Sequence, residues 1–345
     1  YFIKFAIDVM KACIKAISYY LPEKIYSNED FFKEFPDALT SKENLLKIGV
    51  KNRHIIDPGE TASDIAVKAA GKLFTDHQVK PEEIDFLLFC AQEFDYYTPT
   101  SACVIQERLH LPKTCGALDY NLGCSGFVYG LSLAKGLIES IGLKNVLLLT
   151  SSTLTKKFHP KDKSSLFVFG DGAAATLISA RENTGLGQFV FGTDGEGKNK
   201  IIVKDGGARN PLKDSSTKDI TDEFGNTTND ATFYMNGTGV FVFGLKTVPK
   251  MIHDLLAKEN KTISDIDLFI FHQANLFLIN SIRKKLELPE EKVFNFMENT
   301  GNTVSSSIPI ALHEALKCGR AKKGDTVLLA GFGVGLSWAA TTVQL

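Results

Sequence analysis

The chain has 345 residues, with 39 Lys and Arg against 40 Asp and Glu and a formal net charge of −1 at pH 7. Because the two charges nearly balance, composition gives no electrostatic reason to expect nucleic acid or an anionic membrane as a partner. No apolar run approaches the roughly 20 residues that a membrane-spanning helix needs, and the start lacks the layout of a signal peptide. We therefore expect a cytoplasmic protein without membrane association.

The first half of the chain predicts alternating helices and buried strands. Residues 62–74 have a helical apolar pattern, and residues 84–90 form a short apolar run typical of a strand buried on both faces. Cys124 follows, between glycines, and residues 127–137 form an amphipathic stretch that should be helical. A second buried strand is expected at residues 145–150.

The second half repeats this order of elements. Residues 240–257 predict a helix, and residues 266–272 resemble the earlier run at 84–90. A helix at 309–319 and a strand at 325–330 match 128–138 and 145–150 at nearly the same spacing. Such alternation predicts parallel β-α units with helices on both sides of the sheets.

The chain therefore looks like two similar α/β halves. The apolar pattern is interrupted near residues 180–187, and we place the division there. The expected parts are an N-terminal extension at residues 1–9, a first half at 10–183 that holds the cysteine, and a second half at 184–345.

Three separate segments carry groups suited to acyl transfer: Asn121-Leu-Gly-Cys124-Ser-Gly126, Phe271-His272-Gln-Ala-Asn275 and Asn299-Thr-Gly-Asn302-Thr. A thiol at a helix N-terminus is favoured as thiolate by the helix dipole. An inert buried cysteine is the commoner case, but the flanking glycines favour an exposed turn. The rival Ser125 lacks the glycine spacing of a serine-hydrolase elbow.

The histidine and the asparagine would be ordinary if each stood alone. A lone His at the end of an apolar run is more often a hydrogen-bonded core residue, and Asn302 sits in a turn-like sequence. The six cysteines form no C-x-x-C pair and are not grouped with histidines, so we expect no metal site.

The glycine-rich loop 331–335 superficially resembles a dinucleotide-binding loop. Too few residues follow Gly335 for the helix and second strand of a Rossmann unit. The loop is better suited to bringing a backbone N–H close to a developing oxyanion, and we expect the N–H groups of Cys124 and Val334 to form that oxyanion hole.

Taken in order, these segments resemble the β-ketoacyl-acyl carrier protein synthase III family of thiolase-fold condensing enzymes. Plant-type polyketide synthases share the Cys, His, Asn order but have a different histidine motif. The resemblance covers nearly the whole chain and includes Met10-Lys-Ala-Cys-Ile, Tyr20-Leu-Pro-Glu-Lys-Ile, Gly49-Val-Lys-Asn-Arg53-His54-Ile, Glu60-Thr-Ala-Ser-Asp64, Phe169-Gly-Asp171-Gly-Ala and Gly331-Phe-Gly-Val-Gly335-Leu-Ser-Trp338.

The resemblance implies a fold and a reaction. It implies a five-layer α-β-α-β-α arrangement, a homodimer and a role in fatty acid biosynthesis without a cofactor. Cys124 would take an acyl group from acyl-CoA or an acyl-carrier thioester, then condense it with a malonyl thioester and release CO2. His272 and Asn302 would donate hydrogen bonds to the enolate left by decarboxylation.

Other positions acquire roles by the same resemblance. Asn275 matches a contact to the pantetheine arm, and Gly333, Gly335 and Thr98 match substrate-binding positions. The basic cluster of Arg283, Lys284 and Lys285 matches the docking site for the acyl carrier protein. A solvated helix face explains these three charges almost as well.

Three positions depart from the family pattern. Asn44 stands near the place of a Trp that stacks on the CoA adenine, Thr98 replaces a Phe or a catalytic Glu, and Phe277 replaces an Arg. Asn44 and Thr98 together favour acyl chains longer than acetyl over acetyl-CoA, whereas Phe277 concerns docking of the carrier protein. The alternatives are a specialised longer-chain acyltransferase or condensing enzyme of secondary lipid or polyketide synthesis, and a silent partner subunit, against which the intact Cys, His and Asn argue.

Overall fold

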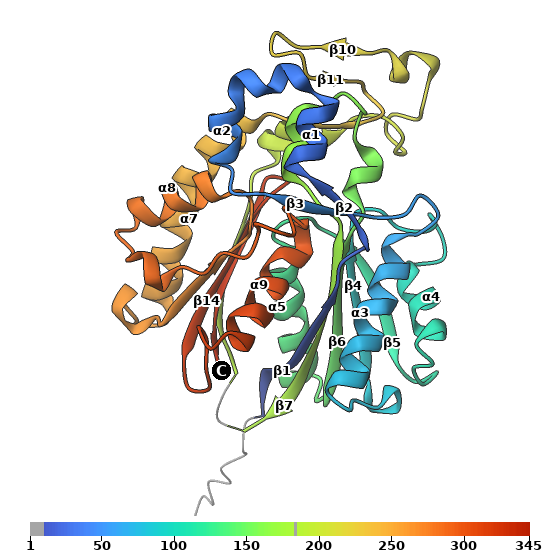
Figure 1. The fold of residues 1–345 in the computed structure, drawn as a ribbon. Coiled ribbons are helices and arrows are strands. Elements are labelled where there is room, and N and C mark those ends of the chain that lie inside the picture. Colours follow the sequence, from blue (N-terminus) through green and yellow to red (C-terminus); the bar gives the residue numbers. More distant parts are fainter. Residues whose placement is uncertain (1–9, 183–184) are drawn as a thin grey trace, which may run out of the picture.

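The computed structural model describes residues 10–182 and 185–345 of the chain (Figure 1). The expected N-terminal extension at residues 1–9 lies outside the described residues. The expected division between residues 183 and 184 lies outside them as well.

The first sheet is mixed and is built from five strands in the order β1-β7-β6-β4-β5. β4 pairs in parallel with β5 and β6, whereas β7 runs antiparallel to both β1 and β6. The buried strands expected at residues 84–90 and 145–150 are confirmed as β4 and β6. The strands are β1 (Lys11–Tyr20), β4 (Phe86–Ala91), β5 (Gly116–Asn121), β6 (Asn145–Ser152) and β7 (Gly172–Arg181).

The second sheet has four strands in the order β13-β14-β15-β8. β13 and β14 are parallel, but the pairs β14-β15 and β15-β8 are antiparallel. The prediction of parallel units is thus correct for part of each sheet; β14 and β15 are joined by a tight turn, and a parallel pair would need a longer crossover. The strands are β8 (Leu186–Thr193), β13 (Leu268–Phe271), β14 (Thr326–Gly333) and β15 (Ser337–Gln344).

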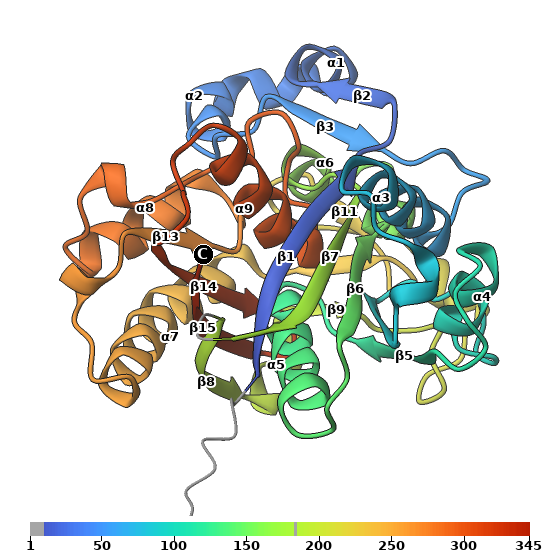
Figure 2. The same ribbon diagram turned by 90° about the horizontal axis from the view of Figure 1, so that it is seen from below.

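Helices between the two sheets and on their outer faces complete the expected five layers (Figure 2). Two helices lie between the sheets, namely α5 (Gly126–Glu139) and α9 (Ser307–Lys317). α3 (Ala62–Asp76) and α4 (Ser101–Arg108) cover the outer face of the first sheet, and α7 (Gly237–Lys258) and α8 (Leu276–Lys285) cover that of the second. The helices predicted at 62–74, 127–137, 240–257 and 309–319 are therefore confirmed.

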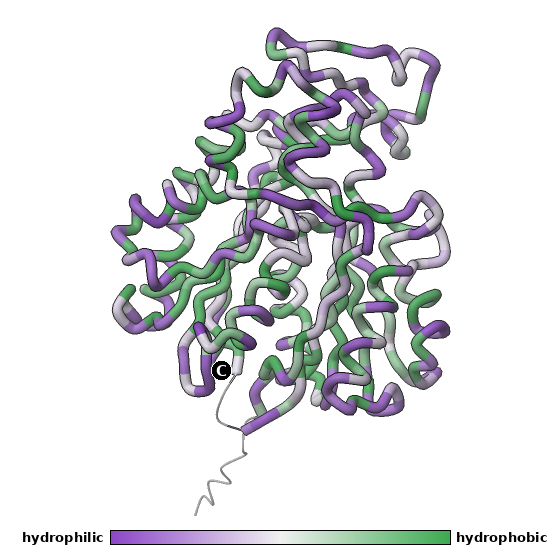
Figure 3. The backbone as a smooth tube through the Cα atoms, viewed as in Figure 1, coloured by the Kyte–Doolittle hydropathy of each residue, from purple (hydrophilic) through white to green (hydrophobic). Residues whose placement is uncertain are grey.

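The middle layer holds the core that joins the two sheets (Figure 3). Leu131 of α5 and Ile308 of α9 are buried in one cluster with Leu148 of β6 and Leu329 of β14. Burial of each such side chain contributes roughly 1.5–3 kcal/mol. Both sheets therefore pack tightly on the same two helices.

Smaller elements lie above the sheets in Figure 1. The short helix α1 packs on α6 through Phe31, Phe35 and Phe167, and Leu45 of α2 packs against the same cluster. The β10-β11 hairpin projects beyond them. The elements are β2 (Lys24–Ser27), α1 (Asn28–Glu34), α2 (Lys42–Leu46), β3 (Asn52–Ile55), α6 (Lys163–Val168), β9 (Ile201–Val203), β10 (Ile220–Thr221), β11 (Thr227–Thr228) and β12 (Phe233–Met235).

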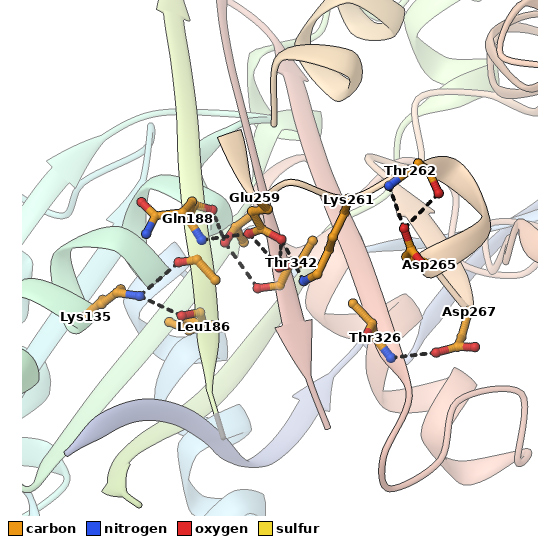
Figure 4. Close-up of polar contacts among 12 residues, drawn as sticks. Lys135, Leu186, Gln188, Glu259, Lys261, Thr262, Asp265, Asp267, Thr326 and Thr342 are labelled. Atoms are coloured by element: carbon orange, nitrogen blue, oxygen red, sulfur yellow. Dashed lines mark hydrogen bonds and ion pairs between the residues drawn. The ribbon is translucent and has the colours of Figure 1, made fainter. Parts of the chain in front are cut away.

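Local hydrogen bonds fix where the elements begin and end. In the segment Glu60 to Asp64, the Thr61 hydroxyl accepts from the Asp64 N–H while the Asp64 carboxylate accepts from the Thr61 N–H, which is a capping box at the start of α3. At the far end of the second sheet, the Glu259 carboxylate accepts from the Gln188 N–H at 2.7 Å, the Thr342 hydroxyl at 2.8 Å and Lys261 at 2.8 Å (Figure 4). This network ties the end of α7 to β8 and β15.

Candidate active site

The site lies where the parallel strands end at their carboxyl termini, which is the usual place for chemistry in α/β folds. A cavity of about 90 Å³ opens there and is mostly apolar. Its wall includes Cys124, His272 and Asn302, so the structure brings together three residues that are far apart in sequence.

Cys124 lies between the end of β5 and the start of α5. The thiol faces the end of β14, which approaches very closely: a Cβ atom on Gly333 would lie 2.7 Å from the Cys124 sulfur. A Cβ atom on Gly123 would lie 2.6 Å from the Val334 side chain. The glycines are therefore needed so that two backbone segments can meet at the sulfur.

Burial raises the pKa of the Cys124 thiol to about 11. The backbone N–H groups of Val334 and of Cys124 itself point at the sulfur and oppose this rise. The expected stabilisation of the thiolate by the helix N-terminus is thus outweighed by loss of water, and the thiol is protonated at pH 7 in this structure. The N–H groups of Cys124 and Val334, which the sequence predicts as an oxyanion hole, thus lie beside the sulfur.

His272 immediately follows β13 and is buried. Loss of water lowers the pKa of its imidazole to about 3, so the ring is neutral at pH 7. Its Nδ1 atom lies 2.7 Å from the Ser307 hydroxyl, which also accepts a hydrogen bond from the Gln273 N–H at 3.3 Å. The ring is therefore held from the side opposite the cavity.

Asn302 lies beside the imidazole at the start of the segment that leads into α9. Its Oδ1 atom accepts from the Val304 N–H at 2.9 Å, which fixes the orientation of the carboxamide. Its Nδ2 atom then lies 3.4 Å from His272 Nε2, and both residues line the cavity. One acceptor in the cavity could thus be contacted by both nitrogen atoms.

Of the four other residues predicted to bind substrate, two line this cavity and two lie outside it. Asn275 and Gly333 line the cavity, and the Asn275 side chain also caps α8 by accepting from the Leu278 N–H at 2.8 Å. Gly335 lies in the turn between β14 and β15, with a φ of +137°, outside the cavity wall. Thr98 is exposed and lies in a separate outer cavity with Tyr96 and Tyr97.

Two of the three basic residues expected to dock a carrier protein are held by their own chain. Arg283 donates to the Leu288 carbonyl at 3.0 Å and lies 3.9 Å from the Glu290 carboxylate. Lys285 donates to the Leu245 carbonyl at 3.0 Å, whereas Lys284 is exposed on the same helix.

Sequence reasoning missed the residues whose hydrogen bonds hold His272 and the segment after β13 in place. Ser307 is the last of three consecutive serines at the start of α9, a visible signal, but only the fold shows that it faces His272. The Gln273 side chain, which accepts from the Phe296 N–H at 2.7 Å, likewise fixes the segment after β13. Among residues 10–182 and 185–345, no cluster of His, Cys, Asp or Glu is suited to hold a metal ion, and no helix there is long and apolar enough to cross a membrane.

The comparisons with known proteins agree with this geometry. Sequence models for 3-oxoacyl-[acyl-carrier-protein] synthase III match residues 118–195, and models for the C-terminal part of that enzyme match residues 256–345. β-Ketoacyl-[acyl-carrier-protein] synthase III from Clostridium perfringens is 36% identical over 94% of this chain and 97% of its own length. The protein of that name from Caldanaerobacter subterraneus is 35% identical over 94% of this chain and 95% of its own.

Solved structures give the same result. A 3-oxoacyl-(acyl-carrier-protein) synthase III structure superposes with a TM-score of 0.95 at 45% identity, covering 97% of this chain and 100% of the other. A 3-oxoacyl-(acyl-carrier protein) synthase from Burkholderia xenovorans has a TM-score of 0.89 at 34% identity, covering 96% and 93%.

The five-layer fold and its cavity define a thiolase-fold condensing enzyme, which is an acyltransferase. Thiol, imidazole and carboxamide meet in that cavity at the edge of both sheets. The chain belongs to the β-ketoacyl-[acyl-carrier-protein] synthase III family.

Proposed function

We propose that Cys124 accepts an acyl group from a thioester and passes it to a malonyl group carried by acyl carrier protein. In the first step the Cys124 sulfur attacks the thioester carbonyl and the donor leaves as a thiol. The N–H groups of Cys124 and Val334 stabilise the oxyanion, and loss of one such donor typically costs about 3 kcal/mol in the barrier.

In the second step the malonyl group loses CO2, and the electron pair of the broken C–C bond forms an enolate on the thioester. His272 Nε2–H and Asn302 Nδ2–H donate to the enolate oxygen. The enolate carbon then attacks the acyl carbonyl on Cys124, so that a β-ketoacyl thioester forms and the Cys124 sulfur is released.

The observation that supports this proposal is the pair of nitrogen atoms 3.4 Å apart in the cavity of the thiol. The Ser307 hydroxyl accepts from Gln273, so its own proton can be donated to His272 Nδ1. That arrangement leaves the ring proton on Nε2, directed at the substrate. A silent partner subunit would need neither the nitrogen pair nor the supporting serine.

Further parts of the proposal concern assembly and partners. We propose that the halves 10–183 and 184–345 act as one cytoplasmic, cofactor-free unit that pairs as a homodimer. β5 is the last strand of its sheet, and an edge strand offers backbone groups for pairing with a second copy. Exposed Lys284 would attract the acidic carrier protein, and exposed Thr98 would reach the partner.

Three variants test the mechanism. Cys124→Ala should lose all covalent acylation, measured by intact-protein mass spectrometry. His272→Ala and Asn302→Ala should retain part of the acylation but lose malonyl decarboxylation, measured as CO2 release. Acyl adduct on Cys124→Ala, or wild-type CO2 release by both other variants, would refute the assignment. A panel of acyl-CoA and acyl-carrier thioesters tests the longer-chain alternative.

A further inference from the structure

A second cavity adjoins the wall of the Cys124 cavity and has a different chemical character. It has a volume of about 260 Å³ and shares Gln92, Leu154, Ile201, Phe233 and Val334 with the first cavity. We call it the polar chamber.

Four polar side chains line this chamber, and three of them, Glu93, Asn121 and Lys157, do not line the cavity around the thiol. Gln92, Glu93, Asn121 and Lys157 line it, and the same four also line the larger outer cavity of about 1010 Å³ that contains Thr98. The chamber therefore lies between the thiol and the protein surface near Thr98. It is a place that an acyl chain on Cys124 could enter.

The polar groups of the chamber are available to a ligand. In the described part of the chain, the side chains of Gln92, Asn121 and Lys157 make no hydrogen bond, while Glu93 accepts one from the Thr153 N–H at 3.2 Å. Burial raises the pKa of the Glu93 carboxyl to about 7, although the Lys157 ammonium partly opposes this rise. An unsubstituted alkyl chain would exclude water from these groups and replace none of its hydrogen bonds.

An acid and an ammonium that line the same chamber limit the kind of group that fits. A terminal amine would be repelled by the Lys157 ammonium, and a terminal carboxylate would be repelled by Glu93 whenever that group is ionised. A hydroxyl suits both forms of Glu93, because it donates to the carboxylate or accepts from the protonated acid, and it also accepts from the Lys157 ammonium.

We propose that the acyl substrate of this chain carries a hydroxyl group on its chain, which binds between Glu93 and Lys157 in the polar chamber. This inference rests on the proposed function, because it requires the acyl group to be attached to Cys124. It differs from a preference for longer alkyl chains, since it assigns the space beyond Gln92 to a polar substituent.

Competition between matched substrates provides the test. The full-length protein would receive equal amounts of hexanoyl-CoA and one of the 3-, 4-, 5- or 6-hydroxyhexanoyl-CoA thioesters, and the adducts on Cys124 would be counted by intact-protein mass spectrometry. At one or more hydroxyl positions we expect the hydroxylated chain to be loaded about tenfold or more in excess, which is the discrimination that a hydrogen-bonding site gives. Equal loading at every position would overturn the inference.

Two variants and two matched control variants test whether Glu93 and Lys157 cause the preference for the hydroxylated chain. Glu93→Gln and Lys157→Met should each bring the loading ratio towards one. Asp95→Asn and Lys156→Met remove the same charges from residues that line the outer cavity but not the chamber, and they should keep the wild-type ratio. Lys157 is exposed, so its variant carries the test if Glu93→Gln does not fold.

The outcomes separate the two proposals. If no thioester loads Cys124, the proposed function fails and this inference fails with it. If hexanoyl and hydroxyhexanoyl groups load equally, the inference alone fails. A shift in the ratio that is as large in the control variants would also overturn it.

Discussion

Gly333→Ala should slow acylation of Cys124 about 100-fold although it removes no reactive atom. The added methyl carbon would lie 2.7 Å from the Cys124 sulfur and 2.8 Å from its Cβ. Non-bonded atoms of this kind normally stay about 3.5–4 Å apart, so either the thiol or the loop has to move by about 1 Å. A displacement of that size costs roughly 100-fold in rate, and overpacking costs about 1–3 kcal/mol of unfolding free energy.

Two measurements on one variant separate these effects. The rate of acyl loading, followed by intact-protein mass spectrometry in a single turnover, should fall about 100-fold, and thermal unfolding should show that most of the protein remains folded. Gly207→Ala is the control, because no atom lies within 4 Å of a Cβ placed there. If folded Gly333→Ala loads at the wild-type rate, the close contact between thiol and loop is not what positions the sulfur.

Three further predictions concern the imidazole and the carrier. Because burial holds the pKa of His272 near 3, malonyl decarboxylation should be almost constant from pH 5 to 8, and a midpoint near 6.5 would contradict a dry, neutral ring. The pKa of His272 is about 3 in the folded protein and near 6.5 in the unfolded chain, so between these values the unfolded chain binds more protons. His272 should therefore lower the unfolding free energy as pH falls from 6.5 to 3, and this dependence should be absent in His272→Gln. Ser307→Ala should reduce CO2 release about tenfold while acyl loading changes little, because the serine orients the ring and does not contact the thiol; equal losses in both would indicate a merely structural role. Lys284→Glu should raise KM for malonyl-acyl carrier protein but not for malonyl-CoA, with exposed Lys113→Glu as control; equal effects of the two variants would exclude docking at α8.

The repeated halves were predictable because strands buried on both faces leave continuous apolar runs in the sequence. The antiparallel strands β7 and β15 could not be predicted in this way. β7 begins with the small residues Ala173 to Ala175 and lacks the run of large apolar residues, Val146 to Leu149, that marked β6. β15 is recognisable only from its pairing with β14. Sheet order depends on contacts between distant segments, which a local pattern does not contain.

The meeting of Cys124, His272 and Asn302 in one cavity was predictable from their motifs, but their electrostatics were not. A helix N-terminus at Cys124 predicts a lowered pKa, whereas the thiol is buried beside Gly333 and Val334, and the loss of water raises its pKa to about 11. The amount of water near a side chain is a property of the whole fold. For the same reason, the chamber between Glu93 and Lys157 was not visible in sequence, since these residues meet only after β4 and the segment after β6 are placed side by side.

The residues expected to carry out the reaction and those expected to select the substrate lie in different parts of the fold. Cys124 and Asn302 each precede a helix of the middle layer, and α5 and α9 share one core with both sheets, so a displacement of either residue would disturb packing across the molecule. The reaction is therefore expected to tolerate little variation. The chamber beyond Gln92 is lined from the segment after β4, the short turn after β6 and the region of β9, and none of its lining residues belongs to that shared core. Differences in substrate within this family should accordingly arise from such wall positions, and in this chain those positions carry an acid and an amine beside apolar side chains.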